Sequence, residues 1–384
     1  MAAPWRPTSW EDIMKFSANR DVLCDALHAV GGGVGNAQTM PILGNVLLTA
    51  KDGELELATT NLDFAVGCAV AASVSKTGSS TLPARKLTGI CRAIDSDIID
   101  LELLSSGNSV RISGGGSVFR LTALPPSDFP SLPQIILENQ ITLKAEALSR
   151  AMNSVDYAQS RDEHRQVLNG TFFQLEDGVL ALVATDGRRL ARSTVPCNGG
   201  DWSFILPARS ATELLRLVEG GTDATLSGTG RQVSFSIFYG ETGKFIRSWL
   251  VSKVVDGNYP NYRQVIPSTP VHRLVLQRET FLAALSRAAL MGGAAPAVQI
   301  KFSENLVELS ASNGEFGDAY ERIAAVAPSQ TPVEISFNPR YLIEPLRARS
   351  SPEVAFEFRD SLSPGVLRSD DDFLCVVMPL RSGS

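Results

Sequence analysis

The sequence is poor in the residues that metal sites and disulfide scaffolds require. Its 384 residues include five cysteines and three histidines, and no two cysteines form a Cys-x-x-Cys pair. An odd number of scattered thiols is typical of a reducing compartment, and it argues against a disulfide framework or a cysteine-ligated zinc site. We therefore expect a cytoplasmic protein without a metal ion or cofactor.

Long apolar runs and an excess of positive charge are also absent. No apolar stretch of about 18 residues could cross a membrane, and the first residues lack an apolar signal-peptide core. The 35 basic and 41 acidic residues give a net charge of −6, so a polyanionic partner would need a local basic surface. With 44% apolar residues the chain can bury a large core.

A catalytic constellation is missing as well. His164 lies beside Asp162 and Glu163, but no nucleophile turn or metal-ligand spacing accompanies it. A solvated loop explains these three residues better than acid–base chemistry does. We do not expect an enzyme.

What the sequence does contain is one order of features that occurs three times. Each time, a strand leads into an amphipathic helix, a strand hairpin follows, and another strand leads into a second helix. The second helix opens at Arg85, Arg209 and Arg340 in turn, at spacings of 124 and 131 residues. The repeats predict three α+β domains, 14–137, 138–267 and 268–384, separated by proline-rich stretches. Residues 1–13 are expected to be a disordered extension.

Turns and helices can be placed from the repeat. The Asp52-Gly53 and Asp177-Gly178 pairs supply the positive φ angles that close two hairpins. The expected helices are 20–30, 85–94, 144–153, 209–219, 278–290 and 339–349. They carry a net charge of +6, which leaves −12 for the rest of the chain. If they shared one face, it would attract a phosphate backbone without reading sequence, although Arg and Lys are also good solvated helix formers.

Six motifs occur in order along the chain: Met40-Pro-Ile-Leu-Gly-Asn45, Leu82-Pro-Ala-Arg-Lys86, Leu168-Asn-Gly170, Ala184-Thr-Asp-Gly-Arg-Arg-Leu190, Asp256-Gly-Asn-Tyr-Pro-Asn-Tyr-Arg263 and Val376-Val-Met-Pro-Leu-Arg381. In these motifs the chain resembles the bacterial replicative sliding clamp, the β subunit of DNA polymerase III. The resemblance implies three clamp-fold domains per chain. It also implies a homodimer closed head to tail into a ring, with helices inside and sheets outside. Double-stranded DNA would pass through this ring, which would tether the replicative polymerase as a processivity factor.

The family's partner site is an apolar pocket between the second and third domains. It captures short peptides from the DNA polymerase III catalytic subunit, the clamp loader and other clamp-binding-motif proteins. The matching positions here are Leu168, Thr185, Gly187, Arg188, Arg189, Leu190, Pro260, Val265, Asn338, Tyr341, Leu362, Val376, Val377, Met378, Pro379, Leu380 and Arg381. The resemblance makes Leu190, Val265, Leu362, Val376 and Met378 the apolar walls. Two buried anchors at about 1.5–3 kcal/mol each would give micromolar-class binding, which suits exchange of partners.

The resemblance also implies a DNA-facing set and a ring joint. The expected DNA-facing residues are Arg85, Lys86, Arg92, Arg150, Arg209, Arg216, Arg287, Arg340, Arg347 and Arg349. At the ring joint, Phe119 and Leu121 would meet Leu290 and Met291 of the other copy, with core packing as the competing explanation. The alternative function is a non-ring α+β peptide-binding scaffold, or a divergent clamp paralogue with restricted partners.

Overall fold

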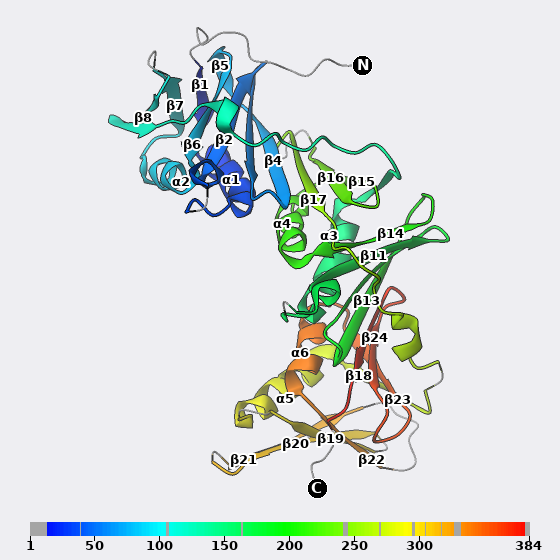
Figure 1. Ribbon diagram of the computed structural model, residues 1–384. Coiled ribbons are helices and arrows are strands. Elements are labelled where there is room, and N and C mark those ends of the chain that lie inside the picture. Colours follow the sequence, from blue (N-terminus) through cyan, green and yellow to red (C-terminus); the bar gives the residue numbers. More distant parts are fainter. Residues whose placement is uncertain are drawn as a thin grey trace. The chain divides into compact units, whose positions relative to one another are not determined.

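Three repeats of one element order build the fold. The computed structural model describes residues 14–38, 40–104, 107–162, 164–240, 245–268, 270–293, 296–303, 305–315, 317–325 and 332–380. The expected extension 1–13 therefore lies outside the described residues. Each repeat runs as one strand, a helix, a group of strands, a second helix and three more strands (Figure 1).

The bounds of the elements follow the repeats. Repeat I contains β1 (Lys15–Asn19), α1 (Arg20–Val30), β2 (Asn45–Lys51), β3 (Glu54–Thr60), β4 (Phe64–Ala71), β5 (Ser73–Lys76), β6 (Gly78–Pro83), α2 (Ala84–Ala93), β7 (Ile98–Leu103), β8 (Ser109–Gly114) and β9 (Ser117–Thr122). Repeat II contains β10 (Ile141–Lys144), α3 (Ala145–Asn153), β11 (Gly170–Glu176), β12 (Val179–Thr185), β13 (Arg189–Pro196), β14 (Trp202–Pro207), α4 (Ala208–Val218), β15 (Asp223–Gly228), β16 (Gln232–Phe238) and β17 (Arg247–Lys253). Repeat III contains β18 (His272–Gln277), α5 (Arg278–Ala288), β19 (Val298–Ser303), β20 (Leu306–Asn313), β21 (Gly317–Ala324), β22 (Val333–Phe337), α6 (Pro339–Arg347), β23 (Glu353–Phe358), β24 (Gly365–Ser369) and β25 (Phe373–Val377).

The six expected helices are confirmed, with starts within one residue and ends within two. Asn19 begins α1 because its side chain accepts hydrogen bonds from the backbone N–H groups of Asp21 and Val22. Both predicted hairpin turns are also confirmed, with φ of +48° at Asp52 and +52° at Asp177. No helix in the described ranges is both long enough and apolar enough to cross a bilayer.

Strand pairing fuses neighbouring repeats. The chain divides into two compact units, whose described residues lie within Met1–Ser149 and Thr212–Val254, and within Arg150–Ala211 and Val255–Ser384. The first unit holds a sheet of order β10-β15-β16-β17-β4-β3-β2-β6, in which β17 of repeat II pairs with β4 of repeat I (Figure 1). The second unit holds a sheet of order β14-β11-β12-β13-β25-β24-β23-β18, in which β25 of repeat III pairs with β13 of repeat II. The compact units therefore divide repeat II between them.

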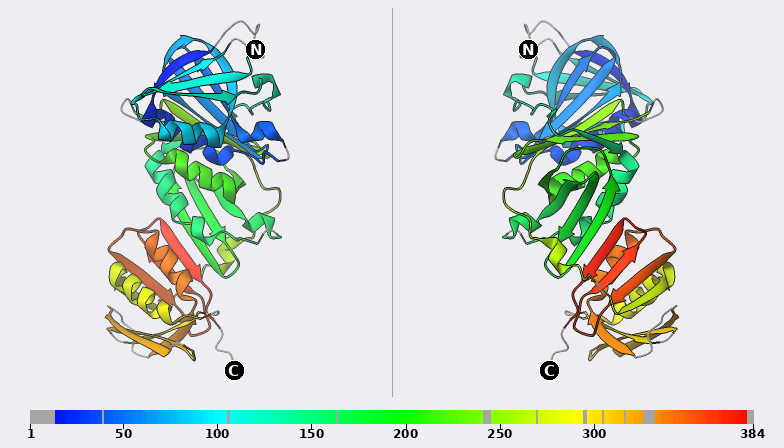
Figure 2. Two further views of the ribbon diagram at one scale, coloured as in Figure 1. Left: turned by 90° about the vertical axis from the view of Figure 1, so that its left-hand side faces the viewer. Right: turned by 90° about the vertical axis from the view of Figure 1, so that its right-hand side faces the viewer.

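Each unit also contains a smaller sheet from a single repeat. In the first unit the order is β5-β1-β7-β8-β9, and in the second it is β21-β20-β19-β22. In repeats I and III the two helices lie side by side and pack on the strands, α1 beside α2 and α5 beside α6. Figure 2 shows α5 in yellow and α6 in orange side by side. In these layers the core is built from side chains such as Phe16, Leu48, Phe302 and Phe356, each no more than 1% exposed.

The pairing of β4 with β17 leaves no room for a side chain at one position, Gly67. Gly67 on β4 lies directly opposite Trp249 on β17, and a Cβ atom added at Gly67 would come within 2.6 Å of the indole ring. Gly67→Ala should therefore destabilise the first unit by about 1–3 kcal/mol through overpacking. Gly89→Ala is the matched control, because Gly89 is exposed within α2 with open space around it. That change should stabilise the chain by about 0.5–1 kcal/mol. Urea unfolding midpoints measure both, and equal midpoints for the two variants would contradict the close packing of Trp249 on Gly67.

Candidate functional site

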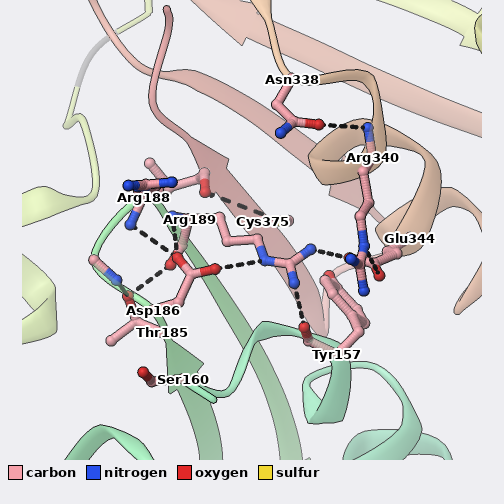
Figure 3. Close-up of polar contacts among 12 residues, drawn as sticks. Tyr157, Ser160, Thr185, Asp186, Arg188, Arg189, Asn338, Arg340, Glu344 and Cys375 are labelled. Carbon is pink, nitrogen blue, oxygen red and sulfur yellow. Dashed lines mark hydrogen bonds and ion pairs between the residues drawn. The ribbon is translucent and has the colours of Figure 1, made fainter. Parts of the chain in front are cut away.

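The loop between β12 and β13 is held by its own side chains. The Asp186 carboxylate accepts hydrogen bonds from the backbone N–H groups of Arg188 and Arg189, at 2.9 and 3.0 Å (Figure 3). The Thr185 hydroxyl accepts from the N–H of Gly187 and donates to the carbonyl of Arg189. Gly187 has a φ of +87°, which favours glycine at this position. These hydrogen bonds fix the backbone at Arg189, the first residue of β13.

Repeat I contains the same loop with different chemistry. Thr60 makes the corresponding hydrogen bonds to the N–H of Leu62 and the carbonyl of Phe64, and Asn61 replaces Asp186 as the acceptor. Leu62 has a φ of +77° at the position of Gly187. Arg189 is replaced there by the buried Phe64. The loop geometry is thus a property of the repeat, and only its side chains can give repeat II a site of its own.

Arg189 is a buried cation at the centre of this region. It is 6% exposed, and its guanidinium contacts Asp186 at 3.2 Å, the carboxylate of Glu344 on α6 and the carbonyl oxygen of Tyr157 (Figure 3). It also lies 4.6 Å from the ring centroid of Tyr341. Burial lowers the pKa of the guanidinium, but the hydrogen bond and charge of Glu344 outweigh burial and hold that pKa above its ordinary value. These contacts tie β13 of repeat II to α6 of repeat III.

The apolar part of the site is a cluster at the β13–β25 junction. Leu190 and Val376 face each other across the two strands and are 3% and 2% exposed. The other buried members of the cluster are Val183, Tyr262, Val366 and Leu374, with Phe172, Tyr259 and Ile266 packed on them. Two of the expected wall residues, Leu190 and Val376, therefore belong to this buried cluster, the apolar floor.

Three other expected wall residues lie at the surface. Val265 ends the short helix η6 (Tyr262–Val265), Leu362 lies between β23 and β24, and Met378 follows β25; they are 48%, 78% and 43% exposed. The N–H of Met378 donates to the carbonyl of Arg188 at 2.9 Å, which holds the segment after β25 beside the loop. Each of the three lies on or next to an element that contributes a residue to the buried cluster, namely η6, β24 and β25. Exposed apolar groups of this kind suit a peptide with hydrophobic anchors.

The remaining expected pocket residues divide into surface and interior. Arg188, Gly187, Pro260 and Leu380 are exposed, while Leu168, Thr185, Asn338, Tyr341 and Pro379 are half-buried. Val377 is fully buried and points to the opposite face of β25 from Val376, since side chains alternate along a strand. Arg381 lies outside the described residues. Asn338 caps α6 by accepting a hydrogen bond from the N–H of Arg340, and Tyr341 lies in the first turn of that helix.

Sequence reasoning missed several members of this site. Tyr259 and Tyr262 stand inside the motif at 256–263, yet their packing on Phe172 was not predicted; Tyr259 stacks on that ring at 4.6 Å. Glu344 gave no signal, because an acidic residue one turn after Arg340 on a helix is an ordinary surface pair. Cys375, next to the floor residue Val376, is fully buried, and burial raises the pKa of its thiol to about 12. That thiol stays protonated at neutral pH.

The expected DNA-facing residues fall into two groups by ion pairing. On α2, Arg85, Lys86 and Arg92 are exposed, and no ion pair holds them within the described residues. Elsewhere carboxylates share the positive charge: Arg150 with Asp372, Arg216 with Glu213, Arg287 with Glu321, and Arg340 with Glu344. Arg209 and Arg347 are exposed. The strongest unneutralised basic group among these helices is therefore on α2.

Arg349 is a correction to the DNA-facing prediction. It is 6% exposed, and its guanidinium contacts Asp370 and Asp372, each at 2.7 Å, and the hydroxyl of Ser154. The helix that was expected to reach Arg349 ends at Arg347, with Pro345 in its last turn. Arg349 therefore turns inward, and a DNA phosphate cannot reach it.

Two of the four residues expected at the ring joint lie on the edge strand β9, and the other two lie on a short helix that packs on the edge strand β21. Phe119 on β9 is 37% exposed and Leu121 half-buried; they pair across the strands with the buried Ile112 and Val110 of β8. Leu290 is 73% exposed and Met291 half-buried, and both belong to the short helix η7 (Ala289–Met291). Core packing alone thus does not account for Phe119 and Leu290.

The repeated folds, the shared sheets and the apolar site at the β13–β25 junction together define a sliding clamp. The family models for the N-terminal, central and C-terminal domains of the DNA polymerase III beta subunit match residues 14–133, 142–261 and 263–381. The beta sliding clamp of Salmonella typhimurium is 33% identical over 96% of this chain and 100% of its own length. The chain belongs to the DNA polymerase III beta subunit family, the beta sliding clamps.

Solved structures agree with this assignment. A sliding clamp from Pseudomonas aeruginosa bound to griselimycin has a TM-score of 0.88 and 29% identity, and the match covers 96% of this chain and 100% of that one. The C. crescentus beta sliding clamp, with polyethylene glycol bound to a putative beta-motif tethering region, has a TM-score of 0.87 and 31% identity. That match covers 97% and 100% of the two chains.

Arg189→Met should destabilise the second unit by about 3–5 kcal/mol, because it removes the buried cation between Asp186 and Glu344 and leaves Glu344 with only its exposed partner Arg340. The matched control is Arg340→Met, which removes an exposed partner of the same Glu344, bound at 2.8 Å, and should cost less than about 1 kcal/mol. Urea unfolding followed by circular dichroism measures both. If Arg189→Met unfolds no earlier than Arg340→Met, the buried ion pairs do not hold β13 to α6.

Proposed function

We propose that two copies of this chain close head to tail into a ring around duplex DNA and act as a processivity factor without catalysing a reaction. In this proposal the ring binds the DNA polymerase III catalytic subunit, the clamp loader and other clamp-binding-motif proteins at the β13–β25 site. The domains are 14–137, 138–267 and 268–384. The protein works in the cytoplasm, a compartment that keeps cysteine thiols reduced.

The observation that carries the proposal is a pair of edge strands. At both junctions within the chain, the last strand of one repeat pairs with the fourth strand of the repeat before it: β17 with β4, and β25 with β13. The corresponding strands still without such a partner are β9, the last of repeat I, and β21, the fourth of repeat III, and each ends its sheet in the described fold. Pairing β9 of one copy with β21 of the other repeats the same junction twice and closes the ring.

The expected joint residues fit this pairing. Phe119 and Leu121 lie on the side of β9 that faces the helices, because their cross-strand partners on β8 belong to the core. The corresponding side of β21 and β20 is covered by η7, which carries Leu290 and Met291. A joint between β9 and β21 would therefore bury Phe119 against the apolar end of η7, at about 25 cal/mol per Å² of apolar surface removed from water.

The basic helices supply the contact with DNA. Arg85, Lys86 and Arg92 of α2 keep their full charge for phosphate, whereas several arginines of the other helices share theirs with carboxylates. Phosphate contacts of this kind hold a duplex without reading bases, so the ring can slide. The acidic remainder of the chain would keep DNA away from surfaces outside the ring's hole.

Met378→Glu should weaken partner binding at least about tenfold, because it places a carboxylate at an exposed apolar position directly after β25. A labelled peptide of the clamp-binding-motif type, with two apolar anchors, reports the affinity by fluorescence anisotropy. Val271→Glu is the matched control, since Val271 is 64% exposed in the same unit and outside the site. Equal affinities for the two variants would place peptide binding elsewhere.

Ring closure is tested on circular and linear DNA. After loading by a cognate clamp loader, a two-chain species should stay on nicked circles through high salt and leave linearised DNA by its ends. Light scattering gives the molar mass alongside. A monomer that leaves both DNAs equally as salt rises would contradict the ring and favour the peptide-binding scaffold without a ring.

A further inference from the structure

Two opposite charges stand without partners on the edge strands β9 and β21. Arg120 on β9 is exposed and lies directly opposite Arg111 of β8, a like charge that already pairs with Glu102 at 3.3 Å. Asp318 on β21 is exposed and lies opposite Ser312 of β20. Neither Arg120 nor Asp318 forms an ion pair within the part of the chain that the structure describes. A like charge directly across an antiparallel pair is unfavourable, so Arg120 would gain from a carboxylate on its open side.

The repeats give the register in which these strands would pair. The fourth strands of the three repeats, β4, β13 and β21, can be aligned through the third strands that pair with them, β3, β12 and β20. The residue six positions after the start of each third strand lies opposite Ala65, Leu190 and Asp318 in turn, so these three occupy equivalent positions. Asp318 is therefore the repeat equivalent of Ala65 and Leu190, which take part in the β4–β17 and β13–β25 pairings.

The last strands can be aligned in the same way. In each repeat, the fifth residue of the strand after the second helix begins a row of directly opposed residues that crosses the sheet to the last strand. The row ends at Arg120 in repeat I, Val251 in repeat II and Val376 in repeat III. At the two internal junctions these positions meet, because Val251 lies opposite Ala65 and Val376 opposite Leu190.

We propose that Arg120 of one copy and Asp318 of the other form an ion pair that sets the register and head-to-tail direction of the ring joint, an inference that rests on the proposed ring. The same register places Val118 opposite Tyr320, which are 68% and 53% exposed, and Phe119 opposite Ala319. It thus covers the exposed apolar side chains of both strands. A joint of two β9 strands would bring arginines together, and one of two β21 strands would bring aspartates together, so the charges disfavour the wrong partners.

The internal junctions explain why a charged pair belongs at this joint. Ala65–Val251 and Leu190–Val376 are apolar pairs between strands of one chain, where the covalent connection already selects the partner. Two separate copies have no such connection. A charge on each edge supplies the selection, and because the pair is exposed, it adds modestly to affinity and leaves the joint able to open.

Complementary charge reversals test the pair. Arg120→Glu alone puts two acidic residues together at both joints of a dimer, and Asp318→Arg alone puts two arginines together. Each variant should therefore dimerise at least about tenfold more weakly than the unmodified chain. An equimolar mixture of the two variants has an opposite-charge pair at both joints of the mixed dimer. The mixture should regain dimers to within about threefold of the unmodified affinity, and the reversals should matter less at high salt.

Sedimentation equilibrium measures the dimer constants, and native mass spectrometry of a mass-tagged variant distinguishes mixed from like dimers. Lys76→Glu is the control for net charge, because Lys76 is exposed on β5, the opposite edge of the same sheet. Mixed dimers in excess of like dimers support the ion pair. Dimers of equal strength for all variants would overturn it and leave the ring in place. An unmodified chain that stays monomeric at every concentration would overturn the ring itself.

Discussion

The structure depends on one backbone interaction, the pairing of the last strand of each repeat with the fourth strand of the repeat before it. This pairing satisfies the N–H and C=O groups of two strand edges and makes one continuous sheet from two domains. Because it occurs at both internal junctions, β17 with β4 and β25 with β13, the chain has one rule for joining domains. The same rule leaves β9 and β21 at the ends of their sheets without such a partner in the described fold.

Shared backbone geometry does not give the two junctions the same chemistry. The Thr-led loop before β4 has the same hydrogen bonds as the loop before β13, yet it presents Phe64 where the second presents Arg189. Arg189 requires Glu344 and Asp186, since a buried guanidinium without a carboxylate would be very unfavourable. The second junction therefore combines buried ion pairs at Arg189, the apolar floor at Leu190 and Val376, and an exposed apolar side chain at Met378. The first junction has no such combination of charge and apolar floor at the equivalent positions, where Phe64, Ala65 and Val251 are all buried apolar residues.

The arginines differ in how far carboxylates neutralise them. Arg349 is buried and paired with Asp370 and Asp372, whereas others, such as Arg340, are paired with a carboxylate on the surface of a helix. Arg85, Lys86 and Arg92 on α2 are exposed and form no ion pair with any residue that the structure describes. A protein that slides along DNA benefits from a small number of unpaired cations. Each further phosphate contact raises the affinity and its dependence on salt, and so slows movement along the duplex. The net charge of −6 is compatible with DNA binding for this reason.

The sequence by itself determined the threefold repeat, the α+β class, six helices to within two residues and the two hairpin turns. These are local: apolar periodicity, capping residues such as Asn19, and Asp-Gly turns act over a few neighbouring positions. Motif resemblance also selected most residues of the site. Only the tertiary structure decided that Leu190 and Val376 form the floor, that Glu344 neutralises Arg189, and that Arg349 turns inward to Asp370 and Asp372. Each of these depends on which distant strands pair and on which side of a helix end the chain leaves, and no local pattern carries that information because burial is a property of the whole packed sheet.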